Sequence, residues 1–111
     1  MRVTDAEIDS LLEKAMEANG ISRWCSGFQT VKPPKTNENL MMNEAISKGS
    51  VLQVHLRDGS TSEPLLKKRV LLREMKRAKK EKVLDFEQVS VSEADLIVQQ
   101  ALFKRVCYPI D

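Results

Sequence analysis

The stretch SVLQVHLRDGSTSE, residues 50–63, constrains the fold most, because its aliphatic residues recur at every second position. Three side chains would point to one face and four to the other: Leu52, Val54 and Leu56 against Val51, Gln53, His55 and Arg57. A period of two is typical of a β-strand with one buried face. We therefore expect the chain to contain a β-sheet.

The same stretch contains Asp58-Gly59, which is a strong reverse-turn signal. It predicts a short hairpin whose return strand covers residues 60–62. Because an isolated hairpin is marginal in water, it must lie against helices or recruit a third strand. Residues 83–89, VLDFEQV, are the candidate for that strand.

Two helices are predicted before this strand. The first begins with a capping box, in which Thr4 and Glu7 exchange hydrogen bonds between side chain and backbone, and ends where Gly20 suits a left-handed residue. The second, shorter helix is capped by Asn37 or Asn39 and stops at Gly49. Its inward side chains are predicted to be Leu40, Met41, Ala45 and Ile46. The segment between the two helices is expected to be a packed loop with a short strand or a turn of helix.

A carboxyl-terminal helix is predicted where Ser92 followed by Asp95 resembles a capping box. Its apolar face comprises Ala94, Ile97, Val98, Ala101 and Leu102. The tail VCYPI, residues 106–110, is apolar enough to return to the core as a short strand that Pro109 ends.

Positive charge is concentrated in KKRVLLREMKRAKKEK, residues 67–82, where nine basic and two acidic residues give a net charge of +7. Ser62 is predicted to cap this helix, with Pro64 in its first turn. Projection at about 100° per residue gives an inward arc of Leu65, Leu71, Leu72, Met75 and Ala78. The opposite arc contains Arg69, Arg73, Lys76, Arg77 and Lys80, with Leu66 and Val70 beside it as an apolar edge.

Length and composition predict a single domain over residues 1–111, with a core mainly of aliphatic residues. The fold class is α+β: about four helices with a two- or three-stranded antiparallel sheet. No apolar stretch is long enough for a membrane span, and the amino terminus lacks the apolar centre of a signal peptide. With only two cysteines, we expect a reduced, cytoplasmic protein.

The chain has no complete catalytic or metal-binding signature. Cys25 with His55 as its base would need a lowered thiol pKa and an orienting group, which the sequence does not indicate. Carboxylate pairs such as Glu93 with Asp95 are explained by their place at a helix amino terminus. We therefore expect a protein without enzymatic activity, cofactor or metal.

Three stretches, ISRWCSG, NEAISKGSVLQVHLRDG and SEADLIVQQALFKRVCY, together resemble a family of small uncharacterised proteins encoded by phages and integrative elements of Gram-positive bacteria. The resemblance implies a mobile-element origin and no defined activity. Arg23 stands where the family has a tyrosine, FKRVCY replaces an acidic ending, and the basic helix is more basic here. These departures indicate that this chain binds a different partner.

The leading hypothesis is a binding protein whose basic helix engages nucleic acid or a host nucleoprotein complex. Five phosphate contacts would give a slope of roughly −4 to −5 in log K against log salt. One outcome would be inhibition of a host defence nuclease, as an anti-CRISPR protein achieves. The alternatives are a homo-oligomer that sequesters a nucleotide signal, and a scaffold that uses protein contacts alone.

Overall fold

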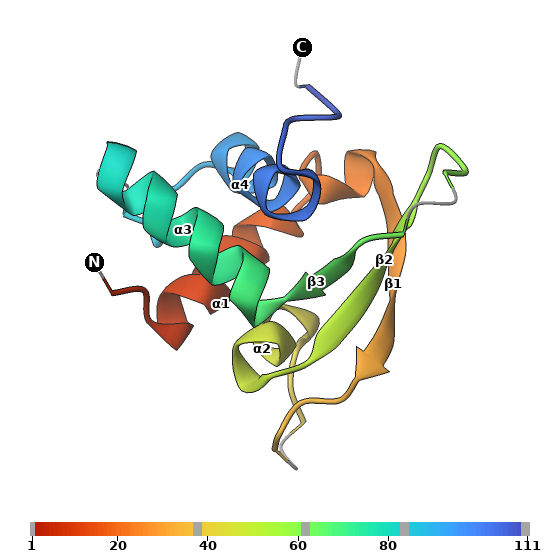
Figure 1. Ribbon diagram of the computed structural model, residues 1–111, viewed down its shortest axis with the longest axis horizontal. Helices are drawn as coiled ribbons and strands as arrows, with labels where there is room; N and C mark the ends of the chain where they lie inside the picture. Colours follow the sequence, from red (N-terminus) through yellow and green to blue (C-terminus); the bar gives the residue numbers. More distant parts are fainter. Residues whose placement is uncertain (1, 37–38, 61–62, 83–84, 110–111) are drawn as a thin grey trace.

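The computed structural model describes residues 2–36, 39–60, 63–82 and 85–109. It is a small α+β domain in which the helices lie on one side of a three-stranded antiparallel sheet (Figure 1), and the predicted fold class is confirmed. The elements are α1 (Asp5–Ala15), η1 (Ile21–Arg23), β1 (Cys25–Lys32), α2 (Met42–Ala45), η2 (Ile46–Lys48), β2 (Val51–Leu56), β3 (Leu65–Lys67), α3 (Lys68–Lys82) and α4 (Val91–Phe103).

The central strand β2 shows the predicted alternation, since Leu52 and Val54 are each 1% exposed. Its partners were predicted wrongly. Within the described residues, β3 pairs with one side of β2. The return strand was expected earlier in the chain, over residues 60–62, of which residues 61 and 62 lie outside the described residues. The other partner is β1 and not residues 83–89, whose described part forms a turn and contributes the fully buried Phe86. β1 lacked an alternating signal because it is an edge strand whose second half is exposed.

Helix α1 begins as predicted. The backbone N–H of Glu7 donates to the Thr4 hydroxyl at 3.2 Å, and the Glu7 carboxylate accepts from the Thr4 N–H at 3.0 Å. The helix ends at Ala15, and the left-handed residue beyond it is Asn19, with φ 69°, not Gly20. Gly20 is required for a different reason, because a Cβ there would lie 2.1 Å from the carbonyl oxygen of Ala15.

The caps of the other predicted helices lie elsewhere. Helix α2 begins after Met41, whose N–H donates to Glu44, so Asn39 is not the cap, and Asn37 lies outside the described residues. Met41 is 69% exposed and was wrongly placed inward. Gly49 ends η2 in the left-handed region, as predicted. The carboxyl-terminal capping box is Ser90 with Glu93, two residues before the predicted one, because Asp95 is drawn into the core.

Helix α3 begins at Lys68, directly after β3, so the predicted start near Pro64 is wrong and Ser62 lies outside the described residues. Leu66 anchors this junction, since its side chain is fully buried in β3. Residues of α1, α3, α4 and the sheet form one hydrophobic cluster. None of the described helices is long and apolar enough to cross a membrane.

Candidate nucleic-acid interface

Three buried apolar residues fix the inner side of helix α3. Leu71 and Met75 are fully buried and Ala78 is 5% exposed, as the projection predicted. Leu65, predicted on the same inner side, lies instead on β3 and is 41% exposed. The inner contacts set the rotation of the helix, and therefore decide which of its basic side chains face outward.

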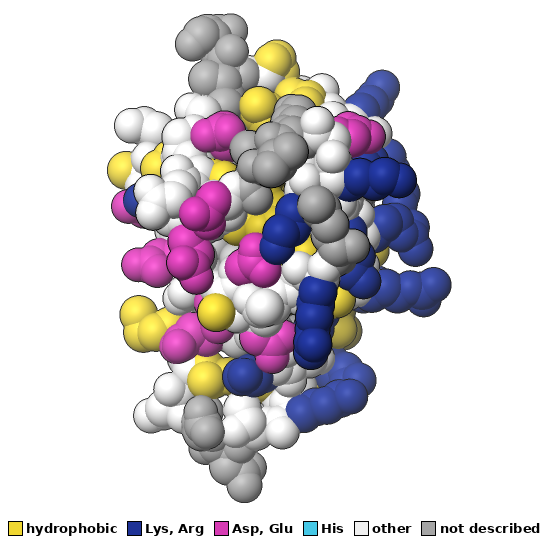
Figure 2. All heavy atoms as spheres, turned by 90° about the vertical axis from the view of Figure 1, so that its left-hand side faces the viewer, with side chains coloured by type: hydrophobic (Ala, Val, Ile, Leu, Met, Phe, Trp, Pro, Cys, Tyr) yellow, Lys and Arg dark blue, Asp and Glu magenta, His cyan; other side chains and the backbone are white. Residues whose placement is uncertain are grey.

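Four basic side chains form the outward stripe of α3, and we call them the cation row: Arg69, Arg73, Lys76 and Lys80. At about 100° and 1.5 Å per residue, they fall within roughly 60° of one another and extend over about 16 Å. All four are exposed, and none forms an ion pair or hydrogen bond with any described residue. Lys and Arg side chains gather along one side of the molecule, beside a surface rich in Asp and Glu (Figure 2).

The basic residues on the flank of α3 that faces α1 are neutralised within the fold. Lys68 pairs with Asp5 at 2.9 Å, and Lys79 pairs with Glu7 at 2.9 Å. The hydrogen bond from Lys68 lowers the pKa of Asp5 below its ordinary value. These pairs attach α3 to α1, and they separate structural cations from the cation row.

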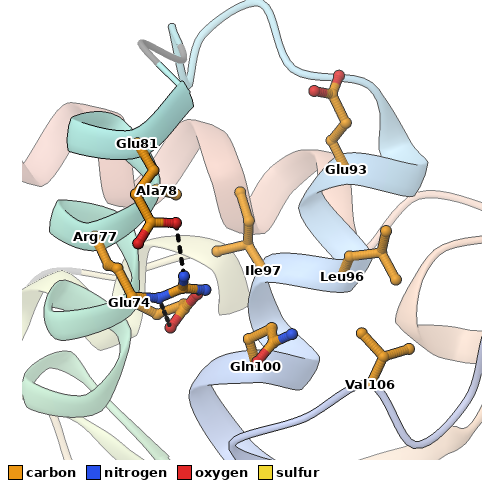
Figure 3. Close-up of a pocket in the computed structure, with 9 residues that line it drawn as sticks. All are labelled: Glu74, Arg77, Ala78, Glu81, Glu93, Leu96, Ile97, Gln100 and Val106. Carbon is orange, nitrogen blue, oxygen red and sulfur yellow. Dashed lines mark hydrogen bonds and ion pairs between the residues drawn. The ribbon is translucent and has the colours of Figure 1, made fainter.

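Arg77 was predicted to belong to the basic surface, but the fold gives it a different environment. Its guanidinium binds Glu74, one turn earlier, and donates to Glu81 at 2.8 Å. Both carboxylates raise the pKa of Arg77 further. Figure 3 shows these three side chains at the rim of a hollow of about 190 Å³ between α3 and α4, over apolar side chains such as Leu96 and Ile97. Arg77 is thus an intrahelical partner of glutamates rather than a free cation.

Of the two residues in the predicted apolar edge, only Val70 lies near the surface. Leu66 cannot contribute to a surface because it is fully buried, and that prediction is wrong. Val70 is half-buried and lines a hollow between α3 and α4 that Arg73 and Lys104 also reach.

A shallow groove of about 630 Å³ lies beside the cation row and brings in a residue that the sequence did not indicate. Among the described residues, its lining consists of Lys35, Gly49, Lys68, Arg69, Leu72, Arg73 and Lys76, and none of these is acidic. Lys35 comes from the segment before α2 and is held by its N–H, which donates to the Lys48 carbonyl at 2.8 Å. Its side chain lies against Gly49, where a Cβ would approach it to 3.3 Å. A lone lysine after two prolines gives no signal of this placement in the sequence.

A buried polar cluster joins η1, α4 and the tail on another part of the molecule. The Asp95 carboxylate is fully buried, pairs with Arg23 and accepts from the Trp24 indole at 2.7 Å. The Gln99 carbonyl oxygen accepts from the Tyr108 N–H at 2.8 Å, and the Tyr108 ring stacks on Trp24 with centroids 5.5 Å apart. The tail is therefore held by side chains, and its described residues 106–109 do not form the predicted strand. Asp95 serves this cluster and not, as predicted, the helix terminus.

The two residues considered for catalysis, Cys25 and His55, lie in surroundings typical of structural residues. Cys25 is 5% exposed beside the packed Trp24, and burial raises the pKa of its thiol, which disfavours the reactive thiolate. His55 pairs with Glu63. Among the described residues, no group of three or more His, Cys, Asp or Glu side chains is placed to hold a metal ion.

Comparison of the chain with protein-family models, with curated proteins and with solved structures gives no match. The mobile-element origin implied by the sequence resemblance stays a prediction.

Proposed function

We propose that this chain is a non-enzymatic protein that binds the phosphate backbone of nucleic acid through the cation row of α3. The observation that carries the proposal is that, in the part of the chain that the structure describes, α3 has paired basic residues on its sides and unpaired ones along its outward face. Acidic partners neutralise Lys68, Lys79 and Arg77, while the outward stripe has no partner among the described residues.

A solvated helix face is the simplest alternative, and the arrangement of like charges argues against it. Arg69 with Arg73, and Lys76 with Lys80, are four residues apart, where like charges destabilise a helix by about 0.2–0.5 kcal/mol per pair. The free protein carries this cost, and a polyanion removes it while releasing counterions from its phosphates. Four contacts predict a slope of about −3.6 in log K against log salt for duplex DNA.

The test compares two double variants that change the net charge equally. R73E/K76E reverses the middle of the cation row, and K14E/R105E reverses two basic residues that lie outside it. Each protein is titrated into a fluorescein-labelled 12-base-pair DNA duplex from 50 to 300 mM salt, with anisotropy as the readout. We expect R73E/K76E to lose about 60-fold in affinity at 0.1 M salt, because each lost contact contributes about 0.9 of a decade. K14E/R105E should bind as the parent does.

Equal losses in the two variants would show that net charge alone attracts the duplex, and absence of binding by the parent would refute the proposal. Competition by a free nucleotide at equal concentration of phosphate would favour the nucleotide-sequestering alternative. Inhibition of a host defence nuclease is a further consequence we propose, because a nuclease and this chain would compete for the same phosphates. The same pair of variants tests it in a cleavage assay.

A further inference from the structure

Resting on the proposed function, we infer that the groove between α3 and Lys35 receives one backbone strand of a nucleic-acid duplex, with Lys35 as its second wall. The class of ligand follows from the charge of the residues that line the groove. Of the seven described residues that line it, five are basic and none is acidic, and one of the five, Lys68, is already paired with Asp5. A continuous array of phosphates matches such a lining better than a single charged group does.

The groove offers no surface for base stacking. The aromatic residues are Trp24, Phe28, Phe86, Phe103 and Tyr108, and none of them lines the groove. Trp24 and Phe86 are buried in the core, and Tyr108 is stacked on Trp24. Proteins that prefer single strands combine a basic groove with aromatic platforms, whereas contact with phosphates alone suits a duplex, whose bases are already stacked. Recognition through the backbone also implies binding without sequence preference.

The dimensions of the cation row set the length of the contact. Its extent of about 16 Å, of which the groove covers the part from Arg69 to Lys76, spans about five base-pair steps along the duplex axis, because successive phosphates of a strand advance 3.4 Å along that axis. Lys35, from the segment before α2, lines the groove together with Arg69 and Arg73 of α3. A strand lying in the groove would therefore meet cations from two segments that are far apart in the sequence.

Lys35 is held in place before any ligand arrives. Its backbone is fixed to Lys48, and its alkyl chain rests on Gly49, whose φ of 95° and missing side chain leave room for it. The contact of its alkyl chain with Gly49 pre-orders the Lys35 side chain. K35A is a mild substitution, since the backbone contact stays intact.

The experiment measures the salt dependence of binding for the parent, K35A, R73E/K76E and the control K14A. Each is titrated with the 12-base-pair duplex and with one of its single strands, and thermal unfolding verifies that the variants are folded. We expect the parent to bind the duplex at least tenfold more tightly than the single strand. K35A should reduce the salt slope for the duplex by about 0.9 and weaken binding about eightfold at 0.1 M salt, while K14A should change neither.

The outcomes separate the two proposals. If R73E/K76E loses binding and K35A behaves as K14A does, the cation row stands and the two-walled groove is refuted. If the single strand binds as tightly as the duplex, the choice of duplex is refuted. If the parent binds neither nucleic acid, the proposed function fails and this inference fails with it. A twofold or larger difference between duplexes of unrelated sequence would overturn recognition through the backbone alone.

Discussion

Replacing Asp95 with asparagine tests how much of the stability of this fold depends on one buried carboxylate. The side chain of Asp95 is 0% exposed, and that of its ion-pair partner Arg23 is 29% exposed. D95N keeps the shape of the side chain and an oxygen for the Trp24 indole. It also places an amide nitrogen in the position of the oxygen that faces Arg23, so that two donors oppose each other.

The magnitude follows from burial. Removing one partner of a buried ion pair costs about 3–5 kcal/mol, and Arg23 can regain some water, so we expect about 3 kcal/mol. For a domain of 111 residues, this corresponds to a fall in Tm of about 13 °C. W24F provides the comparison, because it leaves the Asp95 carboxylate bound by Arg23 while it removes the indole donor and part of the ring that packs on Tyr108, so its cost is an upper limit for the hydrogen bond. That single hydrogen bond contributes about 1 kcal/mol.

Urea denaturation gives both free energies of unfolding. Fluorescence of the single tryptophan reports on D95N, and circular dichroism reports on W24F and on the parent. The expected order is a larger loss for D95N than for W24F, with equal m-values. The reasoning is refuted if D95N costs less than about 1 kcal/mol, because the buried ion pair would then add nothing to the hydrogen bond.

Three further predictions address a close approach, a pKa and the cation row. G20A should destabilise the fold by more than about 3 kcal/mol in urea denaturation, because its Cβ would lie 2.1 Å from a backbone oxygen of α1; a loss under 1 kcal/mol contradicts this. The pKa of Asp5 is lower in the folded than in the unfolded chain, so its stabilisation is complete above about pH 3.8 and is lost as the pH falls through the folded pKa. K68A should raise that pKa toward 3.8 in an NMR titration, and an unchanged pKa would refute the pairing. R73E should raise the free energy of unfolding while weakening duplex binding.

The sequence predicted those elements whose signals are local. The capping box of Thr4 and Glu7 and the left-handed Gly49 each involve a few consecutive residues, and both are confirmed. The alternation of Leu52 and Val54 likewise predicted the central strand, because a strand buried on one face imposes its period on its own sequence.

Elements that depend on distant partners were predicted only loosely, and β1 was expected as no more than a short strand or a turn of helix. The edge strand β1 is largely exposed, so burial leaves no period in its sequence, and only its pairing with β2 defines it. Ser92 and Ser90 both precede an acidic residue by three positions, but only Ser90 is followed there by the Glu that a capping box requires, so this cap could have been predicted from the sequence. What the sequence could not predict is the burial of Asp95, which the distant Trp24 and Arg23 hold in the core.

Helix α3 shows the same difference between what local sequence predicts and what distant contacts decide. A helical projection places Arg77 near Arg73, yet it does not say that Arg77 binds two glutamates while Arg73 has no ion pair with any described residue. Lys35 joins the groove through contacts with Lys48 and Gly49, more than ten residues away in the chain. Net charge along the sequence thus located the helix but could not identify which of its cations are available.

The expected effect of R73E follows from this difference between paired and unpaired cations. Arg73 lies four residues after Arg69, three before Lys76 and four before Arg77. Because Arg77 is already bound by Glu74 and Glu81, R73E converts two repulsive pairs within the cation row into attractive ones. At about 0.2–0.5 kcal/mol for each repulsion removed and for each attraction formed, stability should rise by about 1 kcal/mol in urea denaturation at low salt. The same change removes a phosphate contact and adds a repulsion, so duplex binding should weaken at least eightfold at 0.1 M salt. If R73E both raises stability and weakens duplex binding, the cation row keeps its like charges for binding at a cost in stability. A variant that is less stable than the parent and binds the duplex equally well would contradict both steps of this reasoning.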